Sequence, residues 1–235
     1  MNALKQLDNG LFGTPESIAA LETKKDITLL ILSDSHGQTA VVKNIVKDFG
    51  PESDCLIFCG DGISDILEIF NKSLTNVSLA QSIPSVAALI RGNGDSDRYP
   101  VKFCPGDNDR KEFFHEIKIP RSISFVAGNN KIYLVHGYMQ NVYWGLSKLK
   151  AEAETAAAAI VLFGHTHLAA RAEKGPLYLN PGSCSIPRNG LPPSFALLRY
   201  PAGTTEYTAT FYEIRSRLTG GYKYIPFIPP ALNLF

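Results

Sequence analysis

The 235-residue sequence contains no apolar run long enough to span a membrane, and its first ten residues hold no apolar stretch of the kind found in secretion signals. It also lacks a long basic run, and its formal net charge is only +1. Nucleic acid held mainly through phosphate contacts is therefore not indicated. These absences predict a soluble, cytoplasmic protein without a membrane or nucleic-acid partner.

Cysteine is scarce and shows no metal-binding spacing. Neither a zinc ribbon nor a Cys-x-x-Cys pair can be formed from Cys55, Cys59, Cys104 and Cys184. Cys55 and Cys59 lie inside an apolar stretch, which favours buried free thiols. With 45% hydrophobic and 19% charged residues, the composition is that of a compact globular protein, and the length fits one domain over residues 1–235.

Hydrophobic patterning predicts strands alternating with helices. We expect strands in the segments 27–33, 55–59, 86–90, 122–126, 131–135, 160–163, 177–179, 195–199 and 207–214. We expect helices from Pro15 to about Thr23 and in the segments 39–49, 63–70 and 142–159. The segment 96–116 lacks periodicity and predicts a loop or insertion, with its lone His115 on the surface.

The two ends of the chain extend beyond this pattern. Residues 1–26 form an N-terminal extension. Residues 215–235 form a tail rich in aromatic residues, Ile and Pro, which we expect to dock on the body or on a second copy of the chain in a homo-oligomer.

Polar residues that can bind metal follow five of the apolar strands. Asp34 and His36 follow the first, and at positions i and i+2 of an extended backbone both side chains would point to the same side. The complete set of candidates is Asp34, His36, Asp61, Asn93, His136, His165 and His167. Ligands collect at the carboxyl ends of strands in α/β folds, so these side chains predict a metal site.

The chemistry of this set limits the metal. Carboxylates, an amide and several imidazoles are too rich in nitrogen for calcium and suit Mn²⁺, Fe, Zn²⁺ or Ni²⁺. Seven ligands suit two ions that share a carboxylate, whereas a mononuclear zinc site would leave several idle. Each residue taken alone also has a structural explanation: Asp61 could cap a helix, Asn93 could occupy a left-handed turn, and His165 and His167 could be hydrogen-bonded core residues.

The ordered motifs resemble those of the calcineurin-like metallophosphoesterases, and most closely the small bacterial and archaeal phosphodiesterase branch. The resemblance covers residues 27–212 and rests on Asp34-Ser35-His36, Gly60-Asp61, Gly92-Asn93-Gly94-Asp95, His136-Gly137 and Gly164-His165-Thr166-His167. Asn180-Pro181-Gly182-Ser183 also has a counterpart there, but we assign this turn no chemical role. The resemblance implies two mixed β-sheets packed as a sandwich and flanked by helices, a four-layer α/β fold.

The resemblance also implies roles for individual residues. Asp34, His36, Asp61 and His167 would hold one metal, and Asp61, Asn93, His136 and His165 the other, with Mn²⁺ expected at both. Asp61, Asn93 and Asp95 are the catalytic candidates; Asp95 would orient a ligand histidine or the turn. Arg91, Gly94 and Tyr138 are candidates for substrate binding, and Arg91 faces either phosphate or solvent.

Two positions depart from the family pattern. Many members have a histidine as general acid where this chain has Gly94, although the small phosphodiesterase branch often has cysteine there. Relatives also often have a histidine where this chain has Tyr138. Both departures remove a proton-transfer group and leave the metal ligands intact.

These features predict a dinuclear metal-dependent phosphodiesterase that hydrolyses a small-molecule phosphate ester by in-line attack of a metal-bridging hydroxide. The alternative is a scaffold that uses the same fold for protein contacts, as a retromer subunit of this family does. The intact ligand set argues against that alternative, because clustered carboxylates without a cation are costly.

Overall fold

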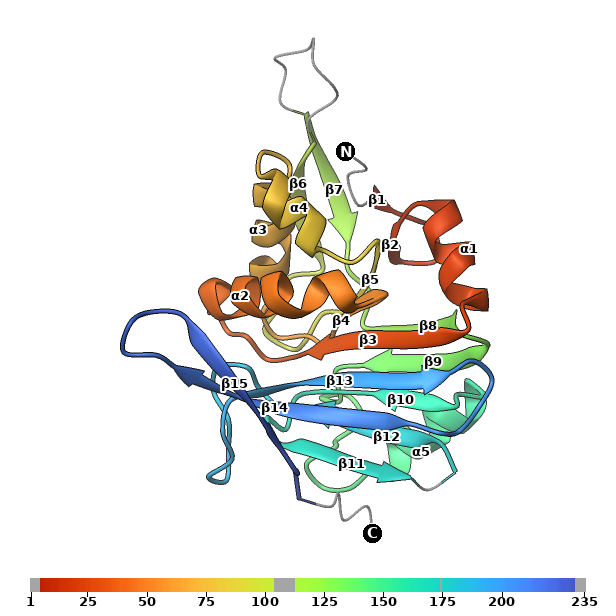
Figure 1. Ribbon diagram of the computed structural model, residues 1–235. Helices are drawn as coiled ribbons and strands as arrows, with labels where there is room; N and C mark the ends of the chain where they lie inside the picture. The colour runs from red at the N-terminus through yellow and green to blue at the C-terminus, as the bar shows by residue number, and fades with distance from the viewer. Residues whose placement is uncertain (1–4, 104–112, 174, 231–235) are drawn as a thin grey trace.

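The computed structural model describes residues 5–103, 113–173 and 175–230. Two β-sheets lie face to face, with helices on the outer face of each (Figure 1). A separate hairpin projects from one side of this sandwich. The two mixed sheets and flanking helices predicted above are confirmed.

The larger sheet has eight strands in the order β1-β2-β5-β4-β3-β13-β14-β15. Strands β3, β4 and β5 run parallel to one another at its centre, and the other strands pair antiparallel to their neighbours. The strands are β1 (Lys5–Gln6), β2 (Leu11–Gly13), β3 (Asp26–Leu32), β4 (Cys55–Phe58), β5 (Val86–Leu89), β13 (Ser194–Pro201), β14 (Thr208–Ser216) and β15 (Tyr222–Phe227).

The second sheet has five strands in the order β11-β12-β10-β9-β8. Here β9, β10 and β12 are parallel, while β8 and β11 are antiparallel edge strands. Its strands are β8 (Ser122–Ala127), β9 (Asn130–Val135), β10 (Ile160–Leu162), β11 (Ala169–Glu173) and β12 (Leu177–Pro181).

Three apolar clusters hold the layers together. The first lies between the sheets, where Ile31 and Ile57 of the larger sheet share a cluster with Leu134 and Leu162 of the smaller one. The second covers the outer face of the larger sheet under α2 (Thr39–Phe49), α3 (Ile63–Ser73) and α4 (Val77–Ser82). The third covers the outer face of the smaller sheet under α5 (Ser147–Thr155). The buried faces therefore fix four layers, with α1 (Pro15–Thr23) closing one edge (Figure 1).

The helices confirm most of the sequence predictions. In α1 the N-cap Thr14 and Ser17 form a reciprocal capping box, and α2 has the predicted bounds. The predicted helix 142–159 is wrong at both ends, because α5 covers only Ser147–Thr155. Gly145 with φ +136° lies before it and Ala157 with φ +49° after it, and neither conformation is helical.

The prediction of a loop over residues 96–116 is also wrong. Strands β6 (Arg98–Phe103) and β7 (Phe113–Lys118) pair antiparallel in the projecting hairpin. Tyr99 and Ile117 pack against the cluster under α3, which gives the hairpin an apolar anchor that the polar sequence concealed. Cys104 and the side chain of His115 lie outside the described residues.

The C-terminal tail docks on the body, as expected. Strand β15 pairs with β14, while Tyr222, Tyr224 and Phe227 pack against the apolar clusters. Ile228 is 94% exposed, and Leu232 and Phe235 lie outside the described residues. Cys55, Cys59 and Cys184 are buried free thiols, which confirms the prediction for the first two. Among the described helices, none is long and apolar enough to cross a membrane.

Candidate metal centre

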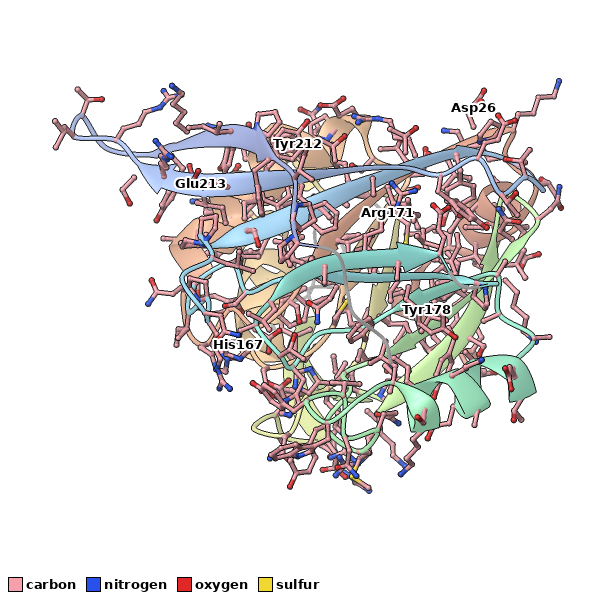
Figure 2. The ribbon with its side chains drawn as sticks, turned by 90° about the horizontal axis from the view of Figure 1, so that it is seen from below. Asp26, His167, Arg171, Tyr178, Tyr212 and Glu213 are labelled. Carbon is pink, nitrogen blue, oxygen red and sulfur yellow. The ribbon has the colours of Figure 1, made fainter. Side chains whose placement is uncertain are left out.

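The polar residues that follow five strands meet at one end of the sandwich. Neighbouring β3, β4 and β5 are parallel in one sheet, as are β9 and β10 in the other. Parallel neighbours present their carboxyl ends at the same edge, so the loops that follow them converge. Figure 2 shows His167 at the opposite end of the molecule from Asp26, the first residue of β3.

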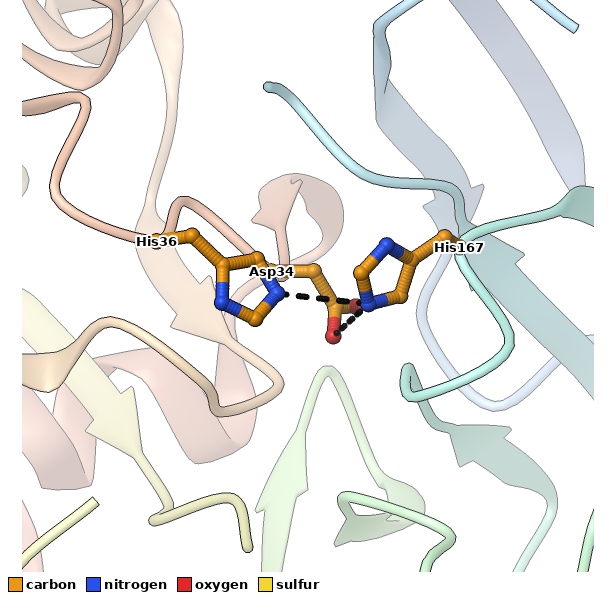
Figure 3. Close-up of side chains that lie close together, drawn as sticks. All are labelled: Asp34, His36 and His167. Carbon is orange, nitrogen blue, oxygen red and sulfur yellow. Dashed lines mark hydrogen bonds and ion pairs between the residues drawn. The ribbon is translucent and has the colours of Figure 1, made fainter. Parts of the chain in front are cut away.

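Asp34, His36 and His167 form the first group of close side chains (Figure 3). Their ligand-capable atoms all lie within 4.8 Å of one another. His167 Nε2 lies 3.2 Å from Asp34 Oδ1 and 3.2 Å from His36 Nε2. Asp34 and His167 are buried and His36 is exposed, so the group opens to solvent on the His36 side.

Asp61, His136 and His165 form the second group, also with ligand-capable atoms within 4.8 Å of one another. His136 Nε2 lies 3.2 Å from Asp61 Oδ2, and the rings of His136 and His165 are 5.0 Å apart. Two hydrogen bonds donated by backbone N–H groups tie the groups together. The His165 N–H donates to Asp34 Oδ2, and the His36 N–H donates to the Asp61 carbonyl.

The backbone of these residues differs from the extended form assumed from sequence. Asp34, His36, Asp61, His165 and His167 all have positive φ, from 45° at His36 to 68° at His165. The expectation that Asp34 and His36 share a side because they are extended is therefore wrong. They come together through left-handed turns. Such conformations cost free energy for residues other than glycine and concentrate at functional sites.

Backbone carbonyls orient two of the imidazoles. His136 Nδ1 lies 2.7 Å from the Cys59 carbonyl, and His167 Nδ1 lies 2.6 Å from the Ile186 carbonyl. Because a carbonyl only accepts, each Nδ1 carries the proton, and each Nε2 directs its lone pair toward the centre. This is the arrangement that prepares a histidine for a metal ion.

The charges of the groups are strongly coupled. Burial opposes ionisation of Asp61, but the contact with His136 and the nearby His36 outweigh it and hold the pKa of this carboxyl well below its usual range. Burial and the neighbouring His136 lower the pKa of His165 to about 4. Asp61 is therefore an anion and His165 a neutral imidazole at neutral pH, the states that bind a cation.

Two buried atoms at the centre have no hydrogen-bond partner, Asp34 Oδ1 and His136 Nε2. Each lies 3.2 Å from one atom of its own group, His136 Nε2 from Asp61 Oδ2 and Asp34 Oδ1 from His167 Nε2. A cation would satisfy both atoms, so the residues present fit a pair of divalent ions.

The remaining predicted site residues lie in the loop after β5. Asn93 is exposed, and its φ is not positive, so the left-handed turn considered for it does not occur. The Gly94 N–H donates to Asp61 Oδ1 over 3.1 Å, which places this loop beside the second group. Arg91 is half-buried, with no hydrogen-bond partner for its Nε.

The Asp95 carboxylate does not lie within either three-residue group. It accepts four backbone N–H groups, those of Asp61, Gly62, Ile63 and Gly92, over 2.8–3.2 Å. It thereby joins the loops after β4 and β5 and holds the backbone of Asp61. This agrees with the expectation that Asp95 orients the turn.

Comparison with known proteins supplies the family. The sequence model of the family described as the calcineurin-like phosphoesterase superfamily domain matches residues 27–203 of this chain. The chain belongs to this superfamily.

Two curated superfamily relatives cover most of their own length. The probable metallophosphoesterase YsnB of Bacillus subtilis is 29% identical over 173 residues, which are 73% of this chain and 83% of YsnB. The phosphodiesterase YfcE of Escherichia coli is 24% identical over 176 residues, 72% of this chain and 86% of YfcE. The fold is also that of zinc-complexed Vps29 from Entamoeba histolytica, with a TM-score of 0.53 and 18% identity over 86% of this chain and 98% of Vps29.

The structure also shows hydrogen bonds to the backbone of the candidate metal centre that the sequence interpretation missed. Ser183 and Ser185 both donate to the Asp34 carbonyl, and Asn180 donates to the Gly164 carbonyl beside His165. The Asn180–Ser183 turn therefore supports both groups. Its presence among the family motifs was the only signal for this role.

Asp65 is a further supporting residue that the sequence interpretation did not single out. This buried carboxylate of α3 accepts hydrogen bonds from Ser35 Oγ, the Gly37 N–H and Thr39 Oγ1. It thus fixes the loop on both sides of His36. The apolar spacing of α3 explains its burial, but no sequence pattern links it to residues 35–39.

Tyr138, Tyr143 and Arg188 border the centre. The rings of Tyr138 and Tyr143 lie 5.3 and 4.9 Å from that of His165. Tyr138 thus lies beside the centre, and its role in substrate binding stays a prediction. Tyr143 and Arg188 were not predicted, because their contact joins residues 45 positions apart.

Proposed function

We propose that this chain is a phosphodiesterase that uses two divalent metal ions, preferably Mn²⁺, to hydrolyse a small-molecule phosphate ester in the cytoplasm. Asp34, His36 and His167 would hold one ion, with Asp61 shared between the two. His136, His165 and Asn93 would complete the other ligand set. When bound, two such ions supply positive charge for the phosphoryl oxygens and an activated water at neutral pH.

The observation that carries this proposal is the pair of joined three-residue groups with unsatisfied buried atoms. Asp34 Oδ1 and His136 Nε2 have no hydrogen-bond partner. His136 and His167 are each oriented by a backbone carbonyl. His136 Nε2 has no such hydrogen bond, whereas a histidine that served only the core would use both ring nitrogens in hydrogen bonds.

The residues around the centre favour particular leaving groups. Hydrolysis adds water across a P–O bond: the hydroxyl joins phosphorus, and the departing oxygen takes up the proton. Gly94 offers no side chain to deliver that proton, and a positioned acid typically contributes roughly 10²–10⁴-fold. Aryl phosphodiesters, whose leaving groups depart readily without a proton, should therefore turn over faster than simple alkyl phosphomonoesters.

Replacement of Asp61 tests the shared ligand. We expect Asp61→Asn to lose metal and at least about 100-fold of the turnover of bis(p-nitrophenyl) phosphate, because even residues that only support a ligand cost 10–100-fold. Asp26→Asn is the matched control, because Asp26 begins β3 at the end of the molecule away from the candidate metal centre. It should keep both its metal and its turnover. Metal analysis and steady-state rates are measured on the same Mn²⁺-loaded samples. An Asp61→Asn protein with two metals and normal turnover would refute the assignment.

A scaffold without catalysis is the alternative, because Vps29 shares the fold and one Vps29 structure carries a bound cyclic peptide. The two functions differ in a simple assay. A scaffold would show no turnover of aryl phosphodiesters at any metal concentration, whereas the proposed enzyme turns them over when loaded with Mn²⁺.

A further inference from the structure

Arg188 lies beside the candidate metal centre in a fixed position. Its backbone N–H donates to the His167 carbonyl over 3.4 Å. Its guanidinium donates to the Tyr143 hydroxyl, which in turn donates to the His165 carbonyl over 3.0 Å. The guanidinium carbon also lies 5.3 Å from the centre of the Tyr143 ring. One cation is thus attached to the backbones of both His165 and His167.

This cation has no carboxylate partner within the described part of the chain. The nearby carboxylates of Asp34, Asp61, Asp65 and Asp95 interact with histidines, hydroxyl groups or backbone N–H groups. Arg188 instead rests on a neutral tyrosine, and its side chain is exposed. A guanidinium held in this way is available to a carboxylate or phosphate, which its planar fork binds through two hydrogen bonds.

Tyr143 connects Arg188 to the second ligand group. The Tyr143 ring contacts that of His165, with the ring centres 4.9 Å apart, and the Arg188 guanidinium carbon lies 5.3 Å from the centre of the same tyrosine ring. Arg188 thus borders the second group through Tyr143, where a substrate group next to the scissile phosphate would approach it.

Exposed apolar side chains gather in the two loops that contain Arg188 and its partner Tyr143. Most of the large exposed hydrophobic side chains described lie in its loop or in the loop after β9, namely Tyr138, Met139, Tyr143, Trp144 and Ile186. Such a concentration beside a polar centre marks a binding surface. It suits the organic body of a substrate whose far end carries the anion.

On the basis of the proposed phosphodiesterase function, we propose that Arg188, held by Tyr143, is a specificity residue that binds a second anionic group of the substrate. The preferred substrates are then phosphodiesters with an apolar linker that ends in a carboxylate or phosphate. Arg188 contacts this second group, and the metal-ligand groups receive the scissile phosphodiester.

A substrate series tests this assignment. ω-Carboxyalkyl p-nitrophenyl phosphates with two to five methylenes are compared with the alkyl p-nitrophenyl phosphates of the same lengths. At the best linker length, the unmodified enzyme should favour the carboxylate by about tenfold in kcat/KM, the scale of one charge-assisted hydrogen bond. The gain should appear mainly in KM, because the carboxylate lies away from the bond that breaks.

Variants separate Arg188 from general electrostatics. Arg188→Gln should abolish the preference for the carboxylate, so that the carboxyalkyl and alkyl series turn over with equal kcat/KM. Arg188→Lys should retain part of the preference for the carboxylate. Arg199→Gln, which removes a partly exposed arginine of β13 that pairs with Glu52, is the matched control and should retain the whole preference.

Binding without turnover gives an independent measurement. Trp144, the only tryptophan, is 92% exposed in the loop of Tyr143 and reports on ligands by its fluorescence. ω-Phosphonocarboxylates should bind the Mn²⁺-loaded enzyme about tenfold more tightly than alkylphosphonates, and Arg188→Gln should remove the difference.

The possible failures are distinct. No turnover of either series would refute the proposed function. Turnover without a preference for the carboxylate, or with a preference that survives Arg188→Gln, would overturn only the role of Arg188. An equal loss for both series in Arg188→Gln would also overturn it, because Arg188 would then bind the scissile phosphate.

Discussion

Gly94 leaves open space beside Asp61. A Cβ built at this glycine would have only Asp61 Oδ1 within 4 Å, at 3.8 Å, and the backbone there does not require a positive φ. A Cβ at position 94 is therefore accommodated without displacing the backbone. In the proposed enzyme, a single substitution could then supply the general acid that Gly94 lacks.

We expect Gly94→His to increase turnover of esters with poor leaving groups, by up to roughly 10²-fold, and to change aryl esters much less. The reason is that only a poor leaving group needs a proton in the transition state. The measurement is the slope of log kcat/KM against the pKa of the leaving group, which is steep in the unmodified enzyme and flatter in the variant. A flat slope in the unmodified enzyme would show that another acid is present or that bond cleavage does not limit the rate.

Gly92 has the opposite environment, two positions before Gly94. A Cβ here would lie 1.9 Å from Asp61 Oδ1 and 2.5 Å from the Asp61 backbone nitrogen. Gly92→Ala must therefore displace Asp61, and we expect it to reduce metal content and to lower turnover at least about tenfold. Gly94→Ala is the matched control and should keep both. Normal metal content in Gly92→Ala would show that Asp61 is not a ligand.

At the scale of elements, the sequence best predicts the strands and helices that depend on residues close together in the sequence. The apolar runs that became β3, β4, β5, β9 and β10 are short, buried and end abruptly, so their periodicity and composition identify them. The polar residues after these runs include all six members of the two close groups. The left-handed turns at Asp34 and His165 could not be anticipated, because they depend on contacts with loops far away in sequence.

The errors have the same cause. Ala, Leu, Lys and Glu favour helix throughout residues 142–159, but Tyr143 instead turns its hydroxyl toward His165, and α5 begins only at Ser147. The hairpin of β6 and β7 is anchored through Tyr99 and Ile117 on a cluster formed by other elements. The roles of Asp65, Ser183 and Arg188 likewise arise from long-range contacts.

Strand β15 shows what the tail contributes. The Tyr224 ring makes edge contacts with Phe49 and Phe195 at centre-to-centre distances of 5.1 and 5.5 Å. We expect Tyr224→Ala to destabilise the fold by about 1–3 kcal/mol, below the cost of a fully buried aromatic residue. For a chain of this length the Tm should fall by about 2–4 °C for each kcal/mol.

Ile228→Ala is the control for Tyr224→Ala, because Ile228 is 94% exposed. It should leave the Tm unchanged in the same thermal melts. Equal Tm values for both variants and the unmodified protein would mean that the tail does not stabilise the body. A change in sedimentation with either variant would support the expected homo-oligomer through the tail.

At the scale of the whole molecule, two sheets supply one centre. Strands β3, β4 and β5 of the larger sheet bring Asp34, His36, Asp61 and Asn93, while β9 and β10 of the smaller sheet bring the other histidines. Each ligand group contains residues from both sheets, so the apolar cluster between the sheets sets how closely the members of each group approach one another. This packing explains how residues as far apart as positions 34 and 167 can lie in the same group of close side chains.

The central claim is tested most directly by measuring bis(p-nitrophenyl) phosphate turnover against the number of Mn²⁺ ions bound per chain in equilibrium dialysis. The account predicts two ions at saturation, with turnover that rises as the second ion binds, because Asp61 would be shared between them. Saturation at a single ion, full turnover before the second ion binds, or two bound ions without turnover would contradict it.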